Sequence, residues 1–177
     1  MTTEQDKTRE ALLSAIQMET DGKEFYLKAS QESGNELGRK LLQKLADEED
    51  VHRKNFEEIY ATIQNKKAWP RMDFQPAGDK GLKTVFYQAI EEMDTAHQKT
   101  ADTELGAVEE ALVMENKTYD FYINRGKNAA HDAETEFYSA LASQERIHHQ
   151  VLLDYSEYLT DPAAWFVQKE HPSLDGG

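Results

Sequence analysis

The stretch Met18–Tyr26 reads METDGKEFY, and 96 positions later Met114–Tyr122 reads MENKTYDFY. The same offset places Leu45, Ala46, Glu49 and His52 on Leu141, Ala142, Glu145 and His148. Self-similarity at a fixed offset indicates a repeated structural unit. The chain therefore contains two copies of one unit, and each copy is expected to contribute half of the fold.

Each copy predicts a helical hairpin. Apolar residues recur at helical spacing over 4–33 and 36–65 in the first copy, and over 103–129 and 132–159 in the second. Helices of about 28 residues are about 42 Å long. No alternating pattern typical of strands competes with these segments, so we expect an all-α four-helix bundle.

Glycine and proline mark the connections. Gly34-Asn35 separates the two helices of the first hairpin, and Ala130-His131 lies near the turn of the second. Residues 66–102, which are rich in proline near their start, join the second helix to the third as a long crossover. Asp161-Pro162 predicts the N-cap and first residue of a short C-terminal helix. We expect residues 1–177 to form a single domain, with its hairpins at about 4–65 and 103–159.

The composition excludes several classes of function. Lys and Arg total 20 against 34 Asp and Glu, giving a net charge of −14, which argues against nucleic-acid binding and favours cations. The 177 residues contain no cysteine, which excludes disulfides, zinc fingers and cysteine-held iron–sulfur centres. The polar start and the lack of a long apolar run predict a cytoplasmic protein without membrane association.

Two Glu-x-x-His pairs are candidate metal ligands, because residues three apart on a helix share one face. The spacing is weak evidence alone, but both pairs fall at the repeat offset, and so do two further glutamates. The six candidates are Glu19, Glu49, His52, Glu115, Glu145 and His148. Asp94-x-x-His97 has the same spacing without a copy at that offset, so we do not include it.

The neighbours of these six residues predict that they are buried. Positions seven apart lie nearly on one line along a helix, and Glu19 lies between Leu12 and Tyr26 on such a line. The other five candidates also have apolar neighbours on both sides. Polar neighbours predict solvent-exposed positions for Glu24, Glu57 and Glu110, and His97, His131 and His149 are also expected at the surface.

Four carboxylates in a bundle core need a compensating charge, because burying them ionised without partners is costly. Their total of −4 is balanced by two divalent cations and two neutral histidines. Oxygen and imidazole ligands without sulfur suit iron or manganese, and zinc would also bind. Protonation, or a buried polar network without metal, is the alternative.

This ligand set is that of the ferritin-like di-metal carboxylate proteins, and the chain resembles their rubrerythrin branch over most of residues 4–159. The residues that carry the resemblance are Glu19 with Phe25-Tyr26, Glu48-Glu49-x-x-His52, Glu115 with Phe121-Tyr122, and Glu145-x-x-His148. The resemblance implies a ferritin-like four-helix bundle with a left-handed crossover, holding two iron ions that react with hydrogen peroxide or oxygen. It leaves open which glutamates bridge the ions and which are terminal.

Two departures from the rubrerythrin pattern affect the expected activity. Rubrerythrins have a second glutamate three residues after the third-helix ligand, where this chain has Thr118, which puts efficient peroxidase turnover in question. They also usually carry a rubredoxin domain with four cysteines, and this chain has none. We therefore expect electrons to come from a separate donor protein or from Fe(II) itself.

Two tyrosines are candidates for a supporting role. Tyr26 and Tyr122 each lie two turns from a candidate glutamate on the same stripe. Each is either a hydrogen-bond partner of a ligand or oxygen species, or an ordinary core aromatic.

Three functions fit these residues. The first is a di-iron oxidoreductase that reduces hydrogen peroxide or oxygen, expected as a homodimer. The second is a ferroxidase for iron storage or buffering, which needs a large assembly. The third is a metal-free interaction bundle.

Overall fold

The computed structural model describes residues 3–66, 68–72, 82 and 101–165. Four long helices make up most of this part of the chain, which contains no strand. They are α1 (Glu4–Glu32), α2 (Glu36–Lys66), α4 (Ala101–Lys127) and α5 (Asp132–Thr160). The predicted all-α bundle is confirmed, and each helix boundary lies within two residues of its predicted position.

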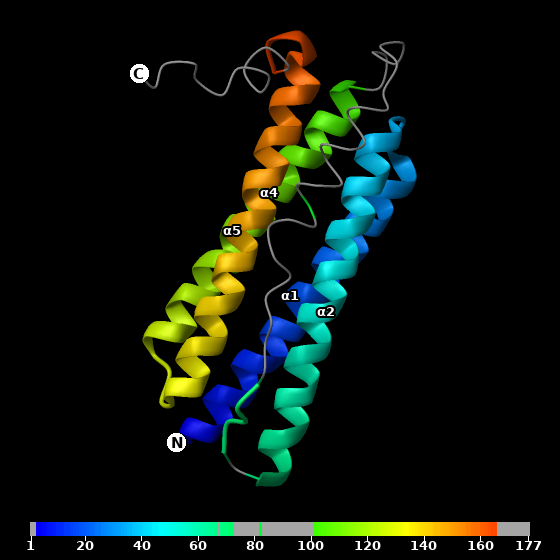
Figure 1. Cartoon of the computed structure of the whole chain (residues 1–177). Helices are drawn as coiled ribbons and strands as arrows, with labels where there is room; N and C mark the ends of the chain where they lie inside the picture. Colours follow the sequence, from blue (N-terminus) through cyan, green and yellow to red (C-terminus); the bar gives the residue numbers. More distant parts are fainter. Residues whose placement is uncertain (1–2, 67, 73–81, 83–100, 166–177) are drawn as a thin grey trace, which may run out of the picture.

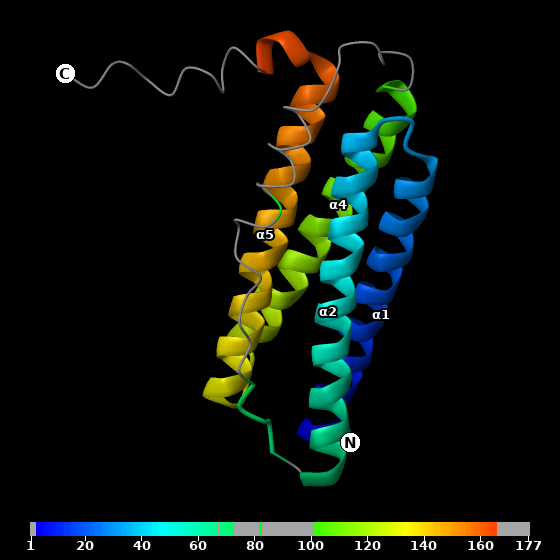
Figure 2. The ribbon, with the colours of Figure 1, turned by 45° about the vertical axis from the view of Figure 1, so that its right-hand side comes forward.

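The helices form two antiparallel hairpins (Figures 1 and 2). α1 packs along α2 and α4 along α5, while α1 also contacts α4 and α2 contacts α5. α2 ends at one end of the bundle and α4 begins at the other, as a long crossover requires. Most of the predicted crossover at 66–102 lies outside the described residues. Of the predicted C-terminal helix, residues 162–165 are described and helical.

Local hydrogen bonds explain where the helices of the first hairpin begin. Thr3 caps α1, because its hydroxyl accepts from the Asp6 amide at 3.2 Å while the Asp6 carboxylate accepts from the Thr3 amide at 2.9 Å. Asn35 performs the capping role for α2, since its side-chain oxygen accepts from the Gly38 amide at 3.0 Å. The Gly34-Asn35 turn predicted from the sequence is thus stabilised by the asparagine side chain.

The apolar core is divided into two clusters, one toward each end of the bundle. One contains Leu41, Leu45, Val108, Tyr155 and Trp165, among others. The other contains Leu12, Phe56, Tyr122, Tyr138 and Trp69, among others. The four glutamates selected from the sequence, Glu19, Glu49, Glu115 and Glu145, are buried between these two clusters, so apolar packing isolates them from solvent on both sides. None of the described helices is both long and apolar enough to cross a membrane.

Candidate metal centre

One candidate residue or pair comes from the middle of each long helix. α1 supplies Glu19, α2 supplies Glu49 and His52, α4 supplies Glu115, and α5 supplies Glu145 and His148. All six side chains belong to residues that are at most 4% exposed. The structure therefore brings together every residue that the sequence singled out as a metal ligand, and it buries all of them.

The six residues fall into two groups of four. One group is Glu19, Glu49, His52 and Glu145; the other is Glu49, Glu115, Glu145 and His148. Within each group, one potential ligand atom from each residue lies within 4.8 Å of the others. Glu49 and Glu145 belong to both groups, whereas Glu19 and Glu115 each belong to one.

The first group is arranged around the Nδ1 atom of His52. That nitrogen lies 3.3 Å from Glu19 Oε2, 3.4 Å from Glu145 Oε1 and 3.6 Å from Glu49 Oε2. Three carboxylate oxygens and one imidazole nitrogen from three helices thus surround one small volume.

The second group repeats this arrangement around His148. Its Nδ1 lies 3.1 Å from Glu49 Oε1, 3.6 Å from Glu115 Oε2 and 3.8 Å from Glu145 Oε2. Glu49 and Glu145 therefore direct one oxygen toward each histidine. Two glutamates are thus shared between the groups and two are not, a distinction that sequence spacing left open.

The two tyrosines cross between the halves of the repeat. Tyr26 on α1 donates a hydrogen bond to Glu115 Oε1 on α4, and Tyr122 on α4 donates one to Glu19 Oε1 on α1. Neither reaches the glutamate of its own helix, because seven residues along a helix span about 10.5 Å. Each bond occupies Oε1 of a glutamate that belongs to one group only, and leaves its Oε2 directed at the centre.

Glu48 supports the centre from behind His148. Its Oε2 lies 3.1 Å from His148 Nε2, and its other oxygen lies 3.7 Å from Lys44 Nζ. An Nε2–H that donates to this carboxylate leaves the Nδ1 lone pair facing the centre. Gln144 occupies the equivalent position of the repeat and is also buried. Sequence reasoning did not select Glu48 as a site residue, although its place directly before Glu49 marks it.

The crowded carboxylates shift the protonation of the centre. Burial raises the pKa of both Glu19 and Glu145, and the nearby Glu49 carboxylate raises both further. Burial opposes the charged form of His52, but its contacts with Glu19 and Glu145 outweigh that effect and raise its pKa. The same balance, dominated on the favourable side by Glu115, raises the pKa of His148.

The potential ligand atoms of the centre are poorly satisfied by hydrogen bonds to one another, and metal binding would satisfy them. Glu19 Oε2, Glu115 Oε2, Glu145 Oε1 and His148 Nδ1 are buried and make no hydrogen bond. Within the described chain, the ion pairs of the six ligand candidates involve one another and Glu48, and no Lys or Arg joins them. Buried polar atoms without partners are costly, and coordination of cations would satisfy these.

A small cavity adjoins the centre on one side. Its volume is about 10 Å³, close to the space of one water molecule. It is lined by Met18, Gly22, Tyr26, Glu49, Met114, Glu115, Thr118 and Glu145. Gly22 and Thr118 are equivalent positions of the repeat, and the Thr118 hydroxyl donates to the Met114 carbonyl at 3.1 Å rather than to the centre. A molecule of one or two heavy atoms could approach the ligands here.

The residues predicted to face solvent do so where they are described. Glu24, Glu57, Glu110 and His131 are exposed, and His149 is half-buried with its ring 3.0 Å from the Asn116 amide nitrogen. His97 lies outside the described residues. The sequence test overlooked three buried glutamates: Glu48, Glu104 and Glu134.

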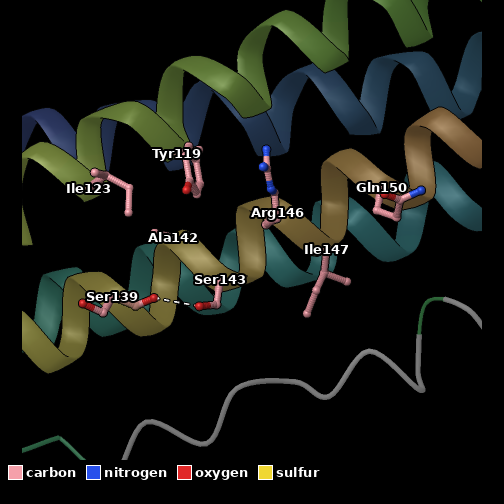
Figure 3. A pocket seen from close by; sticks show the side chains of 8 residues that line it. All are labelled: Tyr119, Ile123, Ser139, Ala142, Ser143, Arg146, Ile147 and Gln150. Atoms are coloured by element: carbon pink, nitrogen blue, oxygen red, sulfur yellow. Dashed lines mark hydrogen bonds between the residues drawn. The ribbon is translucent and has the colours of Figure 1, made fainter.

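A larger pocket lies along α4 and α5, away from the centre (Figure 3). Its volume is about 520 Å³, and its lining includes Tyr119, Arg146 and Gln150 but none of the six candidate ligands. The Arg146 guanidinium lies 5.1 Å from the centre of the Tyr119 ring. This pocket is therefore separate from the candidate metal centre.

The family model described as Rubrerythrin matches residues 10–156 of the chain. The match spans both hairpins and all six candidate ligands. No curated protein and no solved structure matches the chain.

Proposed function

The chain belongs to the rubrerythrin family, and from this we propose that its buried centre holds two iron ions and reduces hydrogen peroxide or oxygen. The observation that carries the proposal is the pair of four-residue groups that share Glu49 and Glu145. Two ions held this way would have four carboxylates and two imidazoles between them. The bound iron would supply the electrons for breaking the O–O bond.

The protein residues would hold, orient and shield this reaction. Glu49 and Glu145 would each bind both ions, while Glu19 and Glu115 would each bind one through Oε2. Tyr26 and Tyr122 fix the terminal carboxylates through their outer oxygens. Apolar clusters on either side of the centre exclude bulk water and limit side reactions.

The small cavity beside Glu115 is the proposed approach for the oxidant. Hydrogen peroxide and oxygen each have two heavy atoms, and a cavity of about 10 Å³ admits nothing much larger without movement of its lining. With Thr118 in place of a further carboxylate, this side of the centre has fewer oxygen ligands than the rubrerythrin pattern provides. We propose that a separate protein returns electrons to the centre.

Metal analysis and rapid kinetics test the proposal. Protein purified without chelators is expected to contain two iron ions per chain, and Fe(II)-loaded protein is expected to oxidise rapidly on mixing with hydrogen peroxide in stopped-flow absorbance measurements. Protein that binds no iron, or whose bound Fe(II) is inert to both oxidants, would contradict the proposal. A large shell-like assembly that accumulates iron would instead favour the ferroxidase function, whereas a homodimer fits the reductase.

A further inference from the structure

A chain of aromatic rings connects the candidate metal centre to one end of the bundle. Tyr122 donates a hydrogen bond to Glu19, and its ring centroid lies 6.0 Å from that of Tyr138. The Tyr138 ring lies 5.7 Å from Trp69, which follows the end of α2. Both tyrosines are fully buried and Trp69 is 9% exposed. Tyrosine and tryptophan are the side chains most easily oxidised by one electron without sulfur chemistry.

Among the residues that the structure describes, the internal repeat places this row of rings in one half of the fold. At the repeat offset, Tyr122 corresponds to Tyr26 and Trp69 to Trp165, but Tyr138 corresponds to Leu42. Leu42 is buried and cannot be oxidised at comparable potential. Tyr26 thus has the same bond to a glutamate of the centre without the tyrosine that would link it to a tryptophan.

The second tryptophan ends a different aromatic row. Trp165 packs on Tyr158 at 5.9 Å between centroids, and Tyr158 stacks on Tyr155 at 6.3 Å. The Tyr155 hydroxyl donates to Glu104 at 2.5 Å, a carboxylate outside the metal centre. Trp165 is 4% exposed, so the two tryptophans are similarly buried while their connections differ.

Hydrogen bonding distinguishes the members of the first row. The Tyr122 hydroxyl has a carboxylate acceptor, so its proton can leave as an electron is removed. Among the described residues, neither the Tyr138 hydroxyl nor the Trp69 indole N–H has a hydrogen-bond acceptor. If either residue loses an electron, it has no neighbour in the described chain to take its proton, so it does not become a stable neutral radical. It instead regains an electron from the next ring or from the previous one.

We propose that Tyr122, Tyr138 and Trp69 form an electron relay that protects the centre when hydrogen peroxide finds only one electron available there. The inference rests on the proposed function. In the first step the O–O bond of hydrogen peroxide breaks with two electrons, one from Fe(II) and one from Tyr122. The phenolic proton joins one of the two hydroxides formed, giving one water, one hydroxide, Fe(III) and a Tyr122 radical.

The relay then moves the vacancy outward. One electron passes from Trp69 through Tyr138 to Tyr122, which recovers its proton from the water just formed. Trp69 is left one electron short, and a one-electron reductant at that end of the bundle refills it. Ascorbate serves as the reductant in the test.

The experiment maps where oxidation accumulates. Iron-loaded full-length protein is mixed with excess hydrogen peroxide in the absence of reductant, and peptide mass spectrometry compares oxidised Trp69 with oxidised Trp165. Trp165 is the comparison for oxidation by species free in solution, since its described row of rings leads to Glu104 and not to a ligand candidate. The expected result is a clear excess of oxidised Trp69, which ascorbate suppresses, and a tyrosyl radical in freeze-quench electron paramagnetic resonance spectra.

Three variants separate the relay from general damage. Tyr138→Phe keeps the ring and removes a hydroxyl that has no acceptor among the described residues, and it is expected to bring the ratio of oxidised Trp69 to oxidised Trp165 down to unity. Tyr122→Phe should do the same and abolish the radical. Tyr119→Phe on α4, whose ring packs with Arg146 at the separate pocket, should leave both signals unchanged.

The outcomes also separate this inference from the proposed function. Iron oxidation by peroxide, followed by absorbance in the same samples, tests the function. Normal iron oxidation with equal damage at the two tryptophans in the wild type, or with the same loss in Tyr119→Phe, would overturn the relay alone. Iron that does not react with peroxide would overturn both.

Discussion

The imidazole rings of His52 and His148 stack across the middle of the bundle, with centroids 5.6 Å apart and planes 14° from parallel. They come from equivalent positions of the internal repeat, and each presents Nδ1 to three carboxylate oxygens. Two ions bound here would therefore have closely similar surroundings.

Metal removal should lower the thermal stability of the protein at neutral pH. Metal binding to the folded state alone adds to the free energy of unfolding, and here it also relieves repulsion among buried carboxylates. Calorimetry of chelator-treated and iron-loaded protein measures the difference in Tm. Equal melting temperatures would contradict the charge argument.

The stabilisation by metal should grow as the pH rises. The pKa values of Glu19, Glu145, His52 and His148 are raised in the folded metal-free protein. Above the unfolded carboxyl value of 4.5, the folded centre holds more protons than the unfolded chain, so metal-free stability falls with increasing pH. Metal binds the deprotonated ligands and its affinity rises. The Tm difference should be larger at about pH 8 than at about pH 5.5; an equal difference would be inconsistent with these shifts.

Shared and terminal glutamates should differ in metal stoichiometry. Glu49→Ala removes an oxygen from both groups and should lose most of the bound iron, whereas Glu19→Ala affects one group and should retain about half. Glu57→Ala is the control, because Glu57 is exposed on α2 and pairs with Arg53 at 2.5 Å. Elemental analysis per folded chain measures the outcome. Full iron content in Glu49→Ala would show that the wrong glutamates were identified.

Glu48→Gln should weaken metal binding without removing a ligand. The carboxylate next to His148 Nε2 fixes the tautomer that directs Nδ1 at the centre, and losing such a partner typically costs roughly 10- to 100-fold in metal affinity. Asp47→Asn is the matched control, since Asp47 is exposed and bonds Gln43 at 3.1 Å. Competition titrations with a chelating dye compare the three proteins. Equal affinity for both variants would argue against the role of Glu48.

Gly22→Ala should slow the reaction with peroxide while leaving the iron content unchanged. A Cβ at Gly22 would lie 3.5 Å from Glu49 Cγ, an ordinary contact that narrows the small cavity. Gly106→Ala on α4 provides the control, because a Cβ there meets nothing within 4 Å. Both changes favour the helix by roughly 0.5–1 kcal/mol, so stability alone cannot explain a difference between them. Stopped-flow measurements compare the rates of iron oxidation by hydrogen peroxide in the two variants. Equal rates would exclude the small cavity as the route by which the oxidant reaches the centre.

The helices and the six candidate ligands followed from the sequence because both depend on local spacing. Asn35 and the turn before α5 marked helix ends. The repeat offset supported these assignments, because the same pattern occurs in both halves of the chain. Residues seven apart share a stripe, so the apolar neighbours of Glu19 revealed its burial without any knowledge of other helices.

That test could not detect contacts between helices, or contacts with the turns that connect them. Glu104 is buried because Ser33 and Tyr155, from other segments, donate to its carboxylate at 2.6 and 2.5 Å. Glu134 lies in the first turn of α5, where its side chain accepts from the Ala130 amide at 3.3 Å. Seven-residue neighbours carry no information about such partners. The crossing of the tyrosine bonds was hidden for the same reason.

The two helices of each hairpin contact each other along much of their length. Contacts between the hairpins, α1 with α4 and α2 with α5, are much fewer. The halves are joined by the two apolar clusters, each of which contains residues of both hairpins, and by polar contacts at the centre: the tyrosine bonds, Glu48 with His148, and the shared glutamates. Cations bound at this position would link the two hairpins, because their ligands come from both. When these cations are removed, we expect the contact between the hairpins to weaken while each hairpin stays folded. Metal depletion should therefore first separate the two hairpins, in a hinge-like motion, before any helix unfolds.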